Sequence, residues 1–260
     1  MRAGRIPTLA ISNEMLIVGL GLYLRDIGTL VVADFHLGYE EALSERGVYV
    51  PPVQLSVIKR LLGLMLDETK ASRLVILGDV KHEFGSALRQ EWREVLDLFS
   101  WLKERGVRAE VVRGNHDNFL IPILKKLEVP LHDPALVEGG YVMVHGHKPL
   151  PPEAYLEDAR YVLMGHEHPA VLFRDELGVK MKFKCFLEGE YEGRRLVVVP
   201  AISPLMPGTE VNVAEPSSLL SPILRSSDLD TFRVYIVDME AGVYDFGPLA
   251  NVKAALSTYL

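Results

Sequence analysis

The first half of the chain alternates short apolar runs with longer segments in which apolar residues recur at helical spacing. The apolar runs predict a hairpin over residues 9–24 and strands at Thr29–Ala33, Leu74–Leu77 and Glu110–Val112. Helices are predicted near Glu40–Glu45, from Pro51 onward, from an N-cap at Ser86 to a stop at Gly106, and over Phe119–Lys126. Strands that alternate with helices are typical of crossover connections and a largely parallel sheet.

Both long helices carry an apolar stripe. The stripes are Val53, Val57, Leu61 and Met65 in the first helix, and Leu88, Trp92, Val95, Phe99 and Leu102 in the second. Residues three or four positions apart lie on one face of a helix. We therefore expect these two faces to pack against the sheet.

The second half of the chain has few helical segments between its apolar runs. Strands are predicted at Ala135–Val137, Tyr141–Val144, Tyr161–Met164, Ala170–Phe173, Val179–Phe186, Leu196–Val199, Thr231–Asp238 and Gly242–Phe246. A turn is expected at Glu190–Arg194, an irregular segment at 203–230 and a terminal helix at Asn251–Tyr259. Because few helices intervene, the pattern favours antiparallel pairing. No linker divides the chain, which predicts one domain over residues 1–260 with two packed sheets.

Composition narrows the class of protein. No apolar run reaches the roughly 18 residues that a membrane span needs, and the N-terminus lacks the apolar core of a signal peptide. We therefore expect a cytoplasmic protein with no membrane partner. Cys185 is the only cysteine, which excludes an intrachain disulfide and a cysteine-based zinc site. The formal net charge of −7 argues against binding nucleic acid through a broad basic surface, so attraction of a polyanion would have to be local.

Ligand-type residues follow five of the predicted strands. They form the motifs Asp34-x-His36, Gly78-Asp79-x-x-His82, Gly114-Asn115-His116-Asp117, His145-Gly146-His147 and Gly165-His166-x-His168. Of the eight histidines, only His132 falls outside these motifs. The carboxyl ends of parallel strands meet at one edge of a sheet, where ligands bind. One metal site assembled from these strand ends is therefore the most economical hypothesis.

Taken together and in this order, the five motifs resemble those of the calcineurin-like metallophosphoesterases. The fuller strings GDVKHEFG, GNHD, VHGHKP and GHEHP are closest to the ICC-like phosphoesterases of archaea and bacteria, some of which are associated with DNA ligase or helicase genes. Double-strand-break repair nucleases and UDP-diacylglucosamine hydrolases of the same superfamily are more distantly similar. The resemblance implies a mixed α/β (α+β) fold, a four-layer sandwich of two mixed β-sheets flanked by helices, which agrees with the predicted strands.

The resemblance also implies roles for individual residues. Asp79 would bridge two metal ions, one bound in addition by Asp34, His36 and His168, and the other by Asn115, His145 and His166. His116 would lie near the leaving group as a general acid or transition-state stabiliser. Asp117 would orient His116 through a carboxylate–imidazole hydrogen bond, or would cap the following helix. His82 would act in the active site or form a structural hydrogen bond in its loop.

Two further assignments stay open on the residues alone. His145 and His147 lie on the same face of an extended strand, and only the order of the motif favours His145 as the ligand. Lys81, Arg113 and Lys148 flank predicted ligands and could hold phosphate, but each could equally be a surface charge.

Oxygen and imidazole ligands without thiolates suit two divalent ions such as Mn²⁺, Fe²⁺ or Zn²⁺, and the resemblance favours Mn²⁺. We predict a metal-dependent hydrolase that cleaves phosphodiester bonds through a metal-bridging hydroxide, with DNA, RNA or nucleotides as substrate and an association with a DNA-repair helicase or ligase. The alternatives are a small-nucleotide phosphodiesterase, a nucleotide-linked lipid hydrolase and a non-enzymatic scaffold. A scaffold would be expected to lack ligand positions, and all seven are filled here.

Overall fold

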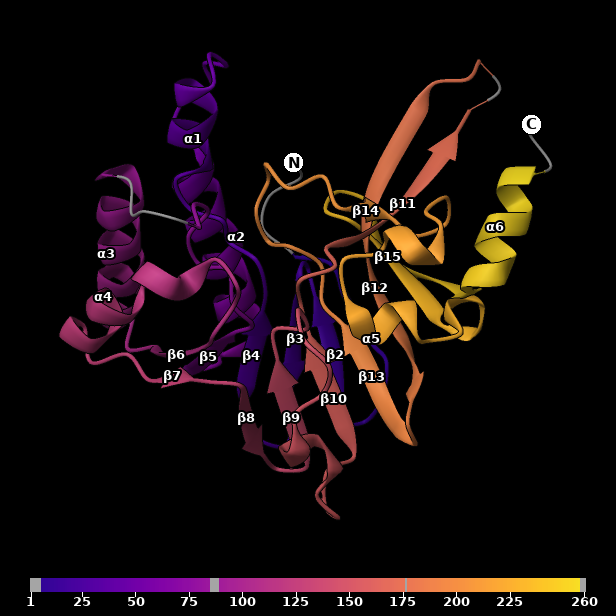
Figure 1. The fold of residues 1–260 in the computed structure, drawn as a ribbon, viewed down its shortest axis with the longest axis horizontal. Helices are drawn as coiled ribbons and strands as arrows, with labels where there is room; N and C mark the ends of the chain where they lie inside the picture. Colours follow the sequence, from indigo (N-terminus) through magenta and orange to yellow (C-terminus); the bar gives the residue numbers. More distant parts are fainter. Residues whose placement is uncertain (1–5, 85–88, 176, 258–260) are drawn as a thin grey trace.

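The computed structural model describes residues 6–84, 89–175 and 177–257. Its first sheet contains strands β1 to β7 in sequence order (Figure 1). These strands are β1 (Thr8–Ala10), β2 (Met15–Val18), β3 (Gly21–Leu24), β4 (Thr29–Val32), β5 (Arg73–Ile76), β6 (Arg108–Val112) and β7 (Leu131–His132). Strands β1 to β4 pair antiparallel, and β4 to β7 pair parallel. The sheet is therefore mixed, with its parallel half built from crossover connections.

The second sheet runs β14-β11-β12-β13-β10-β9-β8, and β15 and β16 are joined to β12. Its strands are β8 (Ala135–Glu138), β9 (Tyr141–Val144), β10 (Tyr161–Met164), β11 (Pro169–Arg174), β12 (Lys180–Tyr191), β13 (Arg194–Val198), β14 (Thr209–Glu210), β15 (Arg233–Asp238) and β16 (Gly242–Pro248). The expectation of antiparallel pairing is wrong for its centre, because β9, β10 and β13 pair parallel. Between β9 and β10 the chain forms only the 3₁₀ turn Pro152–Tyr155, and between β10 and β13 it forms strands β11 and β12, so no helical pattern in the sequence indicates these parallel pairs.

The strands alternate their side chains between an inner and an outer core. In β4, Val31 packs between the two sheets, whereas Leu30 and Val32 face the helices. In β9, Met143 belongs to the inner core and Val142 to the outer one. Such strands are apolar on both faces, which is why they appear in the sequence as continuous apolar runs.

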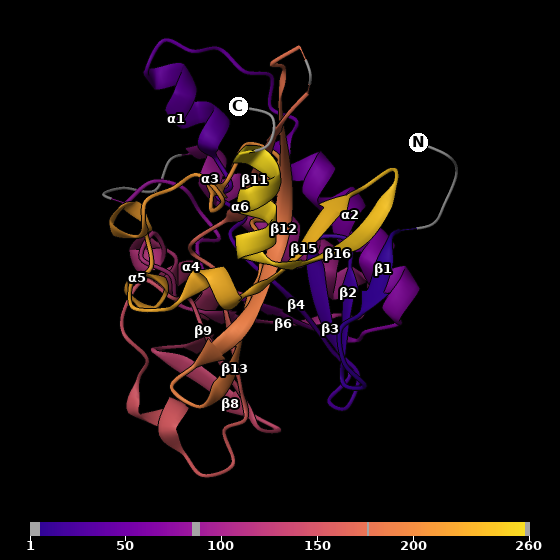
Figure 2. The same cartoon turned by 90° about the vertical axis from the view of Figure 1, so that its right-hand side faces the viewer.

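Helices cover the outer face of each sheet. Helices α2 (Gln54–Thr69), α3 (Arg89–Glu104) and α4 (Ile121–Lys126) pack on the first sheet. Helices α5 (Pro222–Arg225) and α6 (Leu249–Ser257) pack on the second, where α6 lies in front of the sheet in Figure 2. This arrangement confirms the expected four layers. Helix α1 (Tyr39–Glu45) and the β11–β12 hairpin project from the same end of the molecule in both views. No helix in the described ranges is long and apolar enough to cross a membrane.

The structure corrects the predicted faces of the two long helices. In α2, Val53 is exposed, and the buried face contains Ile58, Leu62, Met65 and Leu66. In α3, Trp92 is exposed, and Leu98 replaces it in the core. Each helix has apolar residues on more than one face, so the sheet beneath it decides which face is buried. The predicted N-cap Ser86, the stripe residue Leu88 and the helix end at Tyr259 lie outside the described residues.

Candidate metal centre

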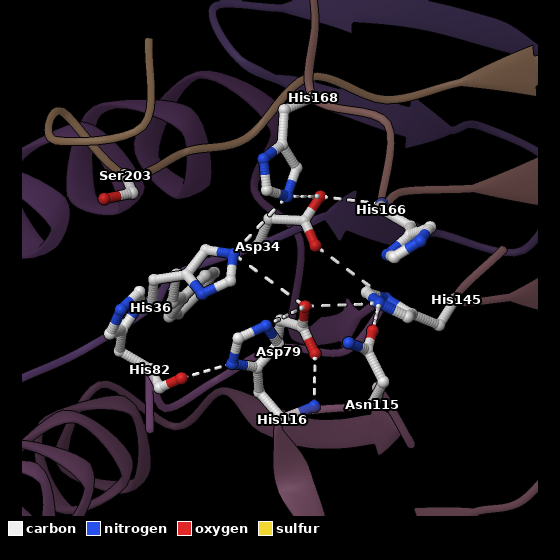
Figure 3. A network of polar contacts seen from close by, with 12 residues as sticks. Asp34, His36, Asp79, His82, Asn115, His116, His145, His166, His168 and Ser203 are labelled. Carbon is white, nitrogen blue, oxygen red and sulfur yellow. Dashed lines mark hydrogen bonds and ion pairs between the residues drawn. The ribbon is translucent and has the colours of Figure 1, made fainter. Parts of the chain in front are cut away.

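The predicted ligands sit in loops that follow five parallel strands. In the first sheet, the loops after β4, β5 and β6 carry Asp34 and His36, then Asp79, then Asn115 and His116. In the second sheet, the loops after β9 and β10 carry His145, His166 and His168. Backbone hydrogen bonds join neighbouring loops: the Asp34 N–H donates to Gly78 O at 3.2 Å, and the His36 N–H donates to Asp79 O at 2.8 Å. The facing carboxyl edges of the two sheets thus form one site (Figure 3).

The first group of ligand-type atoms comes from Asp34, His36, Asp79 and His168, and all of these atoms lie within 4.8 Å of one another. His36 Nε2 lies 3.3 Å from His168 Nε2 and 3.8 Å from Asp79 Oδ2. His168 Nε2 also lies 3.4 Å from Asp34 Oδ2. Four donor atoms that surround one point at these separations are the arrangement that a single cation requires.

The second group contains Asp79, His145 and His166 within the same limit of 4.8 Å. His145 Nε2 lies 3.3 Å from Asp79 Oδ2 and 2.9 Å from Asn115 Oδ1, which brings the Asn115 amide into this group. His145 Nδ1 lies 2.7 Å from the Leu77 carbonyl, the kind of contact that fixes the ring of a metal ligand. Asp79 belongs to both groups, and its carboxylate lies between them in Figure 3.

Five of the seven predicted ligands have left-handed backbones. Their φ angles lie between 49° and 66°, and the residues are Asp34, His36, Asp79, His166 and His168. This conformation is uncommon for residues other than glycine and persists where surrounding contacts enforce it. The backbone turns sharply after each strand, so the ligand side chains are held toward the site.

Two glycines allow the loops to approach closely. A Cβ at Gly114 would lie 2.2 Å from Asp79 Oδ1, and a Cβ at Gly78 would lie 2.5 Å from His145 Nδ1. Gly78 also has a φ of +77°. The glycines of the Gly-Asp and Gly-Asn motifs are therefore required by the packing of Asp79 and His145 as well as by the turns.

Burial sets the protonation of several imidazoles. It lowers the pKa of His166 to about 3 and the pKa of His36 well below its ordinary value. Burial would raise the pKa of Asp79, but neighbouring His145, His36 and His116 lower it overall. Burial would lower the pKa of His145, but the neighbouring Asp79 and Asp34 carboxylates raise it to about 9. His36 and His166 are thus neutral imidazoles with free lone pairs beside the ionised Asp79 carboxylate, and these are donors that suit a divalent cation. His145 is held protonated by the neighbouring carboxylates, so a cation that bound it would displace its proton.

Unpaired buried atoms also fit a cation. Asp34 Oδ1 is buried without a hydrogen-bond partner among the described residues, and Asp34 itself is fully buried. The His36 and His168 nitrogens that face each other at 3.3 Å can share at most one proton in their neutral forms. A buried polar atom without a partner is costly, and a bound cation would satisfy these lone pairs together.

Asp117 makes neither of the contacts that its two predicted roles require. Its buried carboxylate accepts hydrogen bonds from the backbone N–H groups of Asp79 at 2.8 Å, Val80 at 2.9 Å and Gly114 at 2.9 Å. Burial and Asp79 raise its pKa to about 6. Its carboxylate makes no bond to the His116 ring among the described residues, and Asp117 is the first residue of the 3₁₀ turn Asp117–Phe119, whose cap position is held by His116. Asp117 therefore ties the Asp79 loop to the Gly114 loop and positions Asp79.

His116 and His82 lie together at the edge of the site. His116 Nε2 is 3.8 Å from Asp79 Oδ2, its backbone N–H donates to Asp79 Oδ1 at 3.0 Å, and its Nδ1 contacts the His82 carbonyl oxygen. The His82 ring centroid lies 4.1 Å from that of Tyr39 and 5.4 Å from that of His36. His82 thus fixes the His116 ring through its backbone, and its own ring borders the first group of ligands.

The structure shows the surroundings of the residues whose roles had two possible assignments in the sequence. His147 belongs to neither group of ligand atoms, and its ring centroid lies 5.2 Å from that of His145. Lys81 was predicted to hold phosphate or to lie on the surface, and both expectations are wrong. It is fully buried, with Nζ 3.8 Å from Glu91 Oε2. Arg113 donates to Asp133 Oδ2 at 2.6 Å.

Two side chains that support the site, the buried Gln54 and the partly buried Lys184, were missed in the sequence. The Gln54 Nε2 amide contacts Phe35 O and His36 O at 3.0 Å and Ser203 Oγ at 2.7 Å. Lys184 Nζ donates to Ala201 O at 2.6 Å and contacts Ser203 O, and it holds the segment that pairs with Ala33. Neither residue lies in a motif. No local signal marks Gln54, because α2 contains other polar residues such as Ser56, Lys59 and Arg60.

One family model matches the chain, and solved structures resemble it to different degrees. The family model described as calcineurin-like phosphoesterase matches residues 28–170. No curated protein matches the chain significantly. The crystal structure of Pseudomonas putida nuclease MPE is similar with a TM-score of 0.63 and 22% identity, covering 93% of this chain and 100% of that one. The phosphoesterase Yfce from E. coli has a TM-score of 0.41 and 21% identity, covering 81% of this chain and 87% of its own.

Proposed function

This chain belongs to the calcineurin-like phosphoesterase family, and on that premise we propose that it is a phosphodiesterase with two divalent metal ions that acts on nucleic acid or nucleotides. The family makes it a hydrolase of phosphoester bonds. The diester specificity, the pair of metal ions and the class of substrate are the proposal.

One observation supports the binding of two metal ions. Besides a group of three imidazoles, His36, His82 and His116, the described residues contain two groups of donor atoms that share the Asp79 carboxylate. The first would be completed by Asp34, His36 and His168, and the second by Asn115, His145 and His166. We propose Mn²⁺ for both positions on the likeness to the ICC-like phosphoesterases, and Fe²⁺ or Zn²⁺ would suit the same donors.

When bound, two divalent cations supply charge stabilisation for a phosphoryl group and lower the pKa of water. The chain contributes two carboxylates, Asp34 and Asp79, against the four positive charges of such a pair. The remaining positive charge would attract a phosphate ester to a protein whose formal net charge is −7. We propose that His116, whose Nδ1 contacts the His82 carbonyl oxygen and whose Nε2 lies near Asp79, donates a proton or a hydrogen bond from Nε2 to one ester oxygen when its ring is protonated.

Support for nucleic acid or nucleotides comes from the resemblance of the strings GDVKHEFG, GNHD, VHGHKP and GHEHP to the ICC-like phosphoesterases. The similarity to the Pseudomonas putida nuclease concerns the fold alone. The association with a DNA-repair helicase or ligase stays a prediction of the same resemblance.

A metal-dependent activity screen tests the proposal. The protein is stripped with a chelator, supplied separately with Mn²⁺, Fe²⁺ or Zn²⁺, and offered an aryl phosphomonoester, an aryl phosphodiester, a cyclic nucleotide, and single- and double-stranded DNA and RNA. We expect diester hydrolysis that depends on added metal, with Mn²⁺ the most effective. An Asp79→Asn preparation, purified in parallel, controls for contaminating nucleases. A protein inert toward every diester with every metal would overturn the proposal.

A further inference from the structure

An exposed aromatic ring lies against His116. Phe84 is 51% exposed, and its ring centroid lies 3.5 Å from that of His116 with an angle of 33° between the planes. One side of the Phe84 ring is therefore covered by the imidazole, while half of the side chain faces solvent. A single exposed apolar side chain is common on protein surfaces, but this ring lies against His116 at the edge of the proposed metal centre, where an aromatic face can serve as a stacking platform for a nucleobase.

The backbone that carries Phe84 is held by buried groups. Glu91 on α3, which is 1% exposed, accepts hydrogen bonds from the backbone N–H of His82 at 3.1 Å and of Glu83 at 2.6 Å. The buried Lys81 ammonium contacts the Glu83 carbonyl oxygen and pairs with Glu91. The residue immediately before Phe84 is thus fixed on both its N–H and its carbonyl, and Phe84 projects from a supported loop.

The chemistry of this surface favours a flat, uncharged ring as its occupant. Phe84 offers an aromatic face without a charge, and its partner His116 lies 3.8 Å from the Asp79 carboxylate at which the two ligand groups meet. A phosphate held at the metal centre would therefore place one of its two ester substituents near Phe84. Nucleobases stack on aromatic side chains whatever their sequence, whereas a small alkyl ester would gain little from the ring face.

We propose that Phe84 stacks on the nucleobase of the nucleotide that flanks the scissile phosphate on the His116 side. The inference rests on the proposed phosphodiesterase function and adds a base-binding subsite to it. In this role Phe84 increases affinity without reading sequence. Its contribution should therefore appear in KM more than in kcat, and should depend on the presence of a base at one position only.

Dinucleotides with one scissile bond test the subsite. Thymidylyl-thymidine is compared with two analogues in which either the 5′ or the 3′ nucleoside is an abasic sugar, and kcat/KM is measured for the metal-loaded full-length protein. For the wild-type protein, kcat/KM should be about tenfold or more lower on one of the abasic analogues than on thymidylyl-thymidine. In Phe84→Ala and Phe84→Leu, kcat/KM on thymidylyl-thymidine should fall to the value that the wild-type protein has on that abasic analogue. The analogue itself should be hydrolysed as well by these variants as by the wild-type protein. Phe84→Trp should retain the preference.

The matched control is Phe246→Ala. Phe246 is 44% exposed on β16, in the other sheet, and its ring lies 5.9 Å from that of Phe173. This variant should keep the wild-type preference for the base. An equal loss by Phe84→Ala on all three substrates would overturn the inference, because it would make Phe84 a support for His116. Wild-type protein that hydrolyses all three equally, or that cleaves an aryl diester but no dinucleotide, would also overturn it while leaving phosphodiesterase activity intact. Inactivity toward every diester would overturn the proposed function as well.

Discussion

Two clusters of acidic side chains paired with imidazole or basic groups both draw on β5 and β6. The metal centre uses the loops that follow β4, β5 and β6 in the first sheet and β9 and β10 in the second. The second cluster, here called the arginine cluster, consists of Arg73, Glu110, His132 and Glu138, from β5, β6, β7 and β8. Arg73 Nε donates to Glu110 Oε1 at 2.8 Å, Arg73 Nη1 donates to Glu138 Oε2 at 2.5 Å, and His132 Nε2 lies 2.9 Å from Glu110 Oε2.

The two clusters contain similar residue types and differ in how completely their polar atoms are hydrogen-bonded. In the arginine cluster each charged group meets an opposite charge at hydrogen-bond distance. In the metal centre, His36, Asp79 and His168 face one another at 3.3–3.8 Å, and Asp34 Oδ1 has no hydrogen-bond partner among the described residues. Complete hydrogen bonding is what a structural cluster needs. The metal centre contains hydrogen bonds too, such as those that Asp79 Oδ1 and Asp34 Oδ2 accept from the His116 and His166 N–H groups. It still leaves the buried Asp34 Oδ1 unsatisfied within the described ranges and turns the His36 and His168 nitrogens toward each other, and a bound cation would satisfy these atoms.

Asp79→Asn should have the largest effect, because it removes the carboxylate that both groups of ligands share. We expect turnover to fall by at least about a thousandfold and both metals to bind more weakly, measured by steady-state kinetics and by metal analysis after dialysis. Glu110→Gln, a matched loss of a carboxylate in the arginine cluster, should leave both properties nearly unchanged. Two tightly held ions in Asp79→Asn would contradict the sharing of Asp79.

His116→Ala should separate proton donation from metal binding, because His116 contacts Asp79 without completing either proposed ligand set. We expect metal content to stay at the wild-type level while hydrolysis slows by about a hundred- to ten-thousandfold. The loss should be greater for an alkyl leaving group than for p-nitrophenol, since only the alkoxide needs a proton. Equal losses for both leaving groups would exclude an acid role.

Gln54→Ala tests whether hydrogen bonds behind the metal centre position its ligands. The substitution leaves the Phe35 and His36 carbonyls and the Ser203 hydroxyl without their shared donor. We expect metal affinity to fall by about ten- to a hundredfold, as measured by calorimetric titration of stripped protein.

The control for this variant is Gln90→Ala, which removes a side-chain amide bonded to Glu40 and Glu94 instead of the ligand loops. It should reduce stability without changing metal affinity. If both variants lower metal affinity equally, the effect reports general stability and not the positioning of His36.

The smallest predicted effect is the change with pH in the stability that Glu110 of the arginine cluster contributes. Burial raises the pKa of Glu110, but the hydrogen bonds from Arg73 and His132 lower it overall. The stability that Glu110 contributes is therefore present above its unfolded pKa of about 4.3 and is lost as the pH falls through its lower folded pKa. The difference in free energy of unfolding between wild type and Glu110→Gln should be about 1 kcal/mol or less at pH 7, because the pair is partly screened by solvent. Urea unfolding of chelated protein at pH 7 and below pH 4 measures it, and a difference that does not shrink in acid would contradict the assignment.

The sequence by itself determined the positions of most strands and the loops that carry the site. Short apolar runs such as Leu74–Leu77 are a local property, and the residue after each run is fixed by the chain. Strands buried on both faces are mostly apolar, so the ligand-type residues that follow them stand out. The choice of seven ligands among those residues came from the resemblance of the motifs to the metallophosphoesterases.

Only the tertiary structure decided which partners the remaining side chains have. The sequence could not show that Asp117 binds three backbone N–H groups, that Lys81 is buried against Glu91, or that Gln54 reaches the carbonyls of Phe35 and His36. Nor could it choose between the apolar faces of α2 and α3. Each of these contacts joins segments far apart in the chain, and a local pattern of polar and apolar residues carries no information about which distant group will lie opposite.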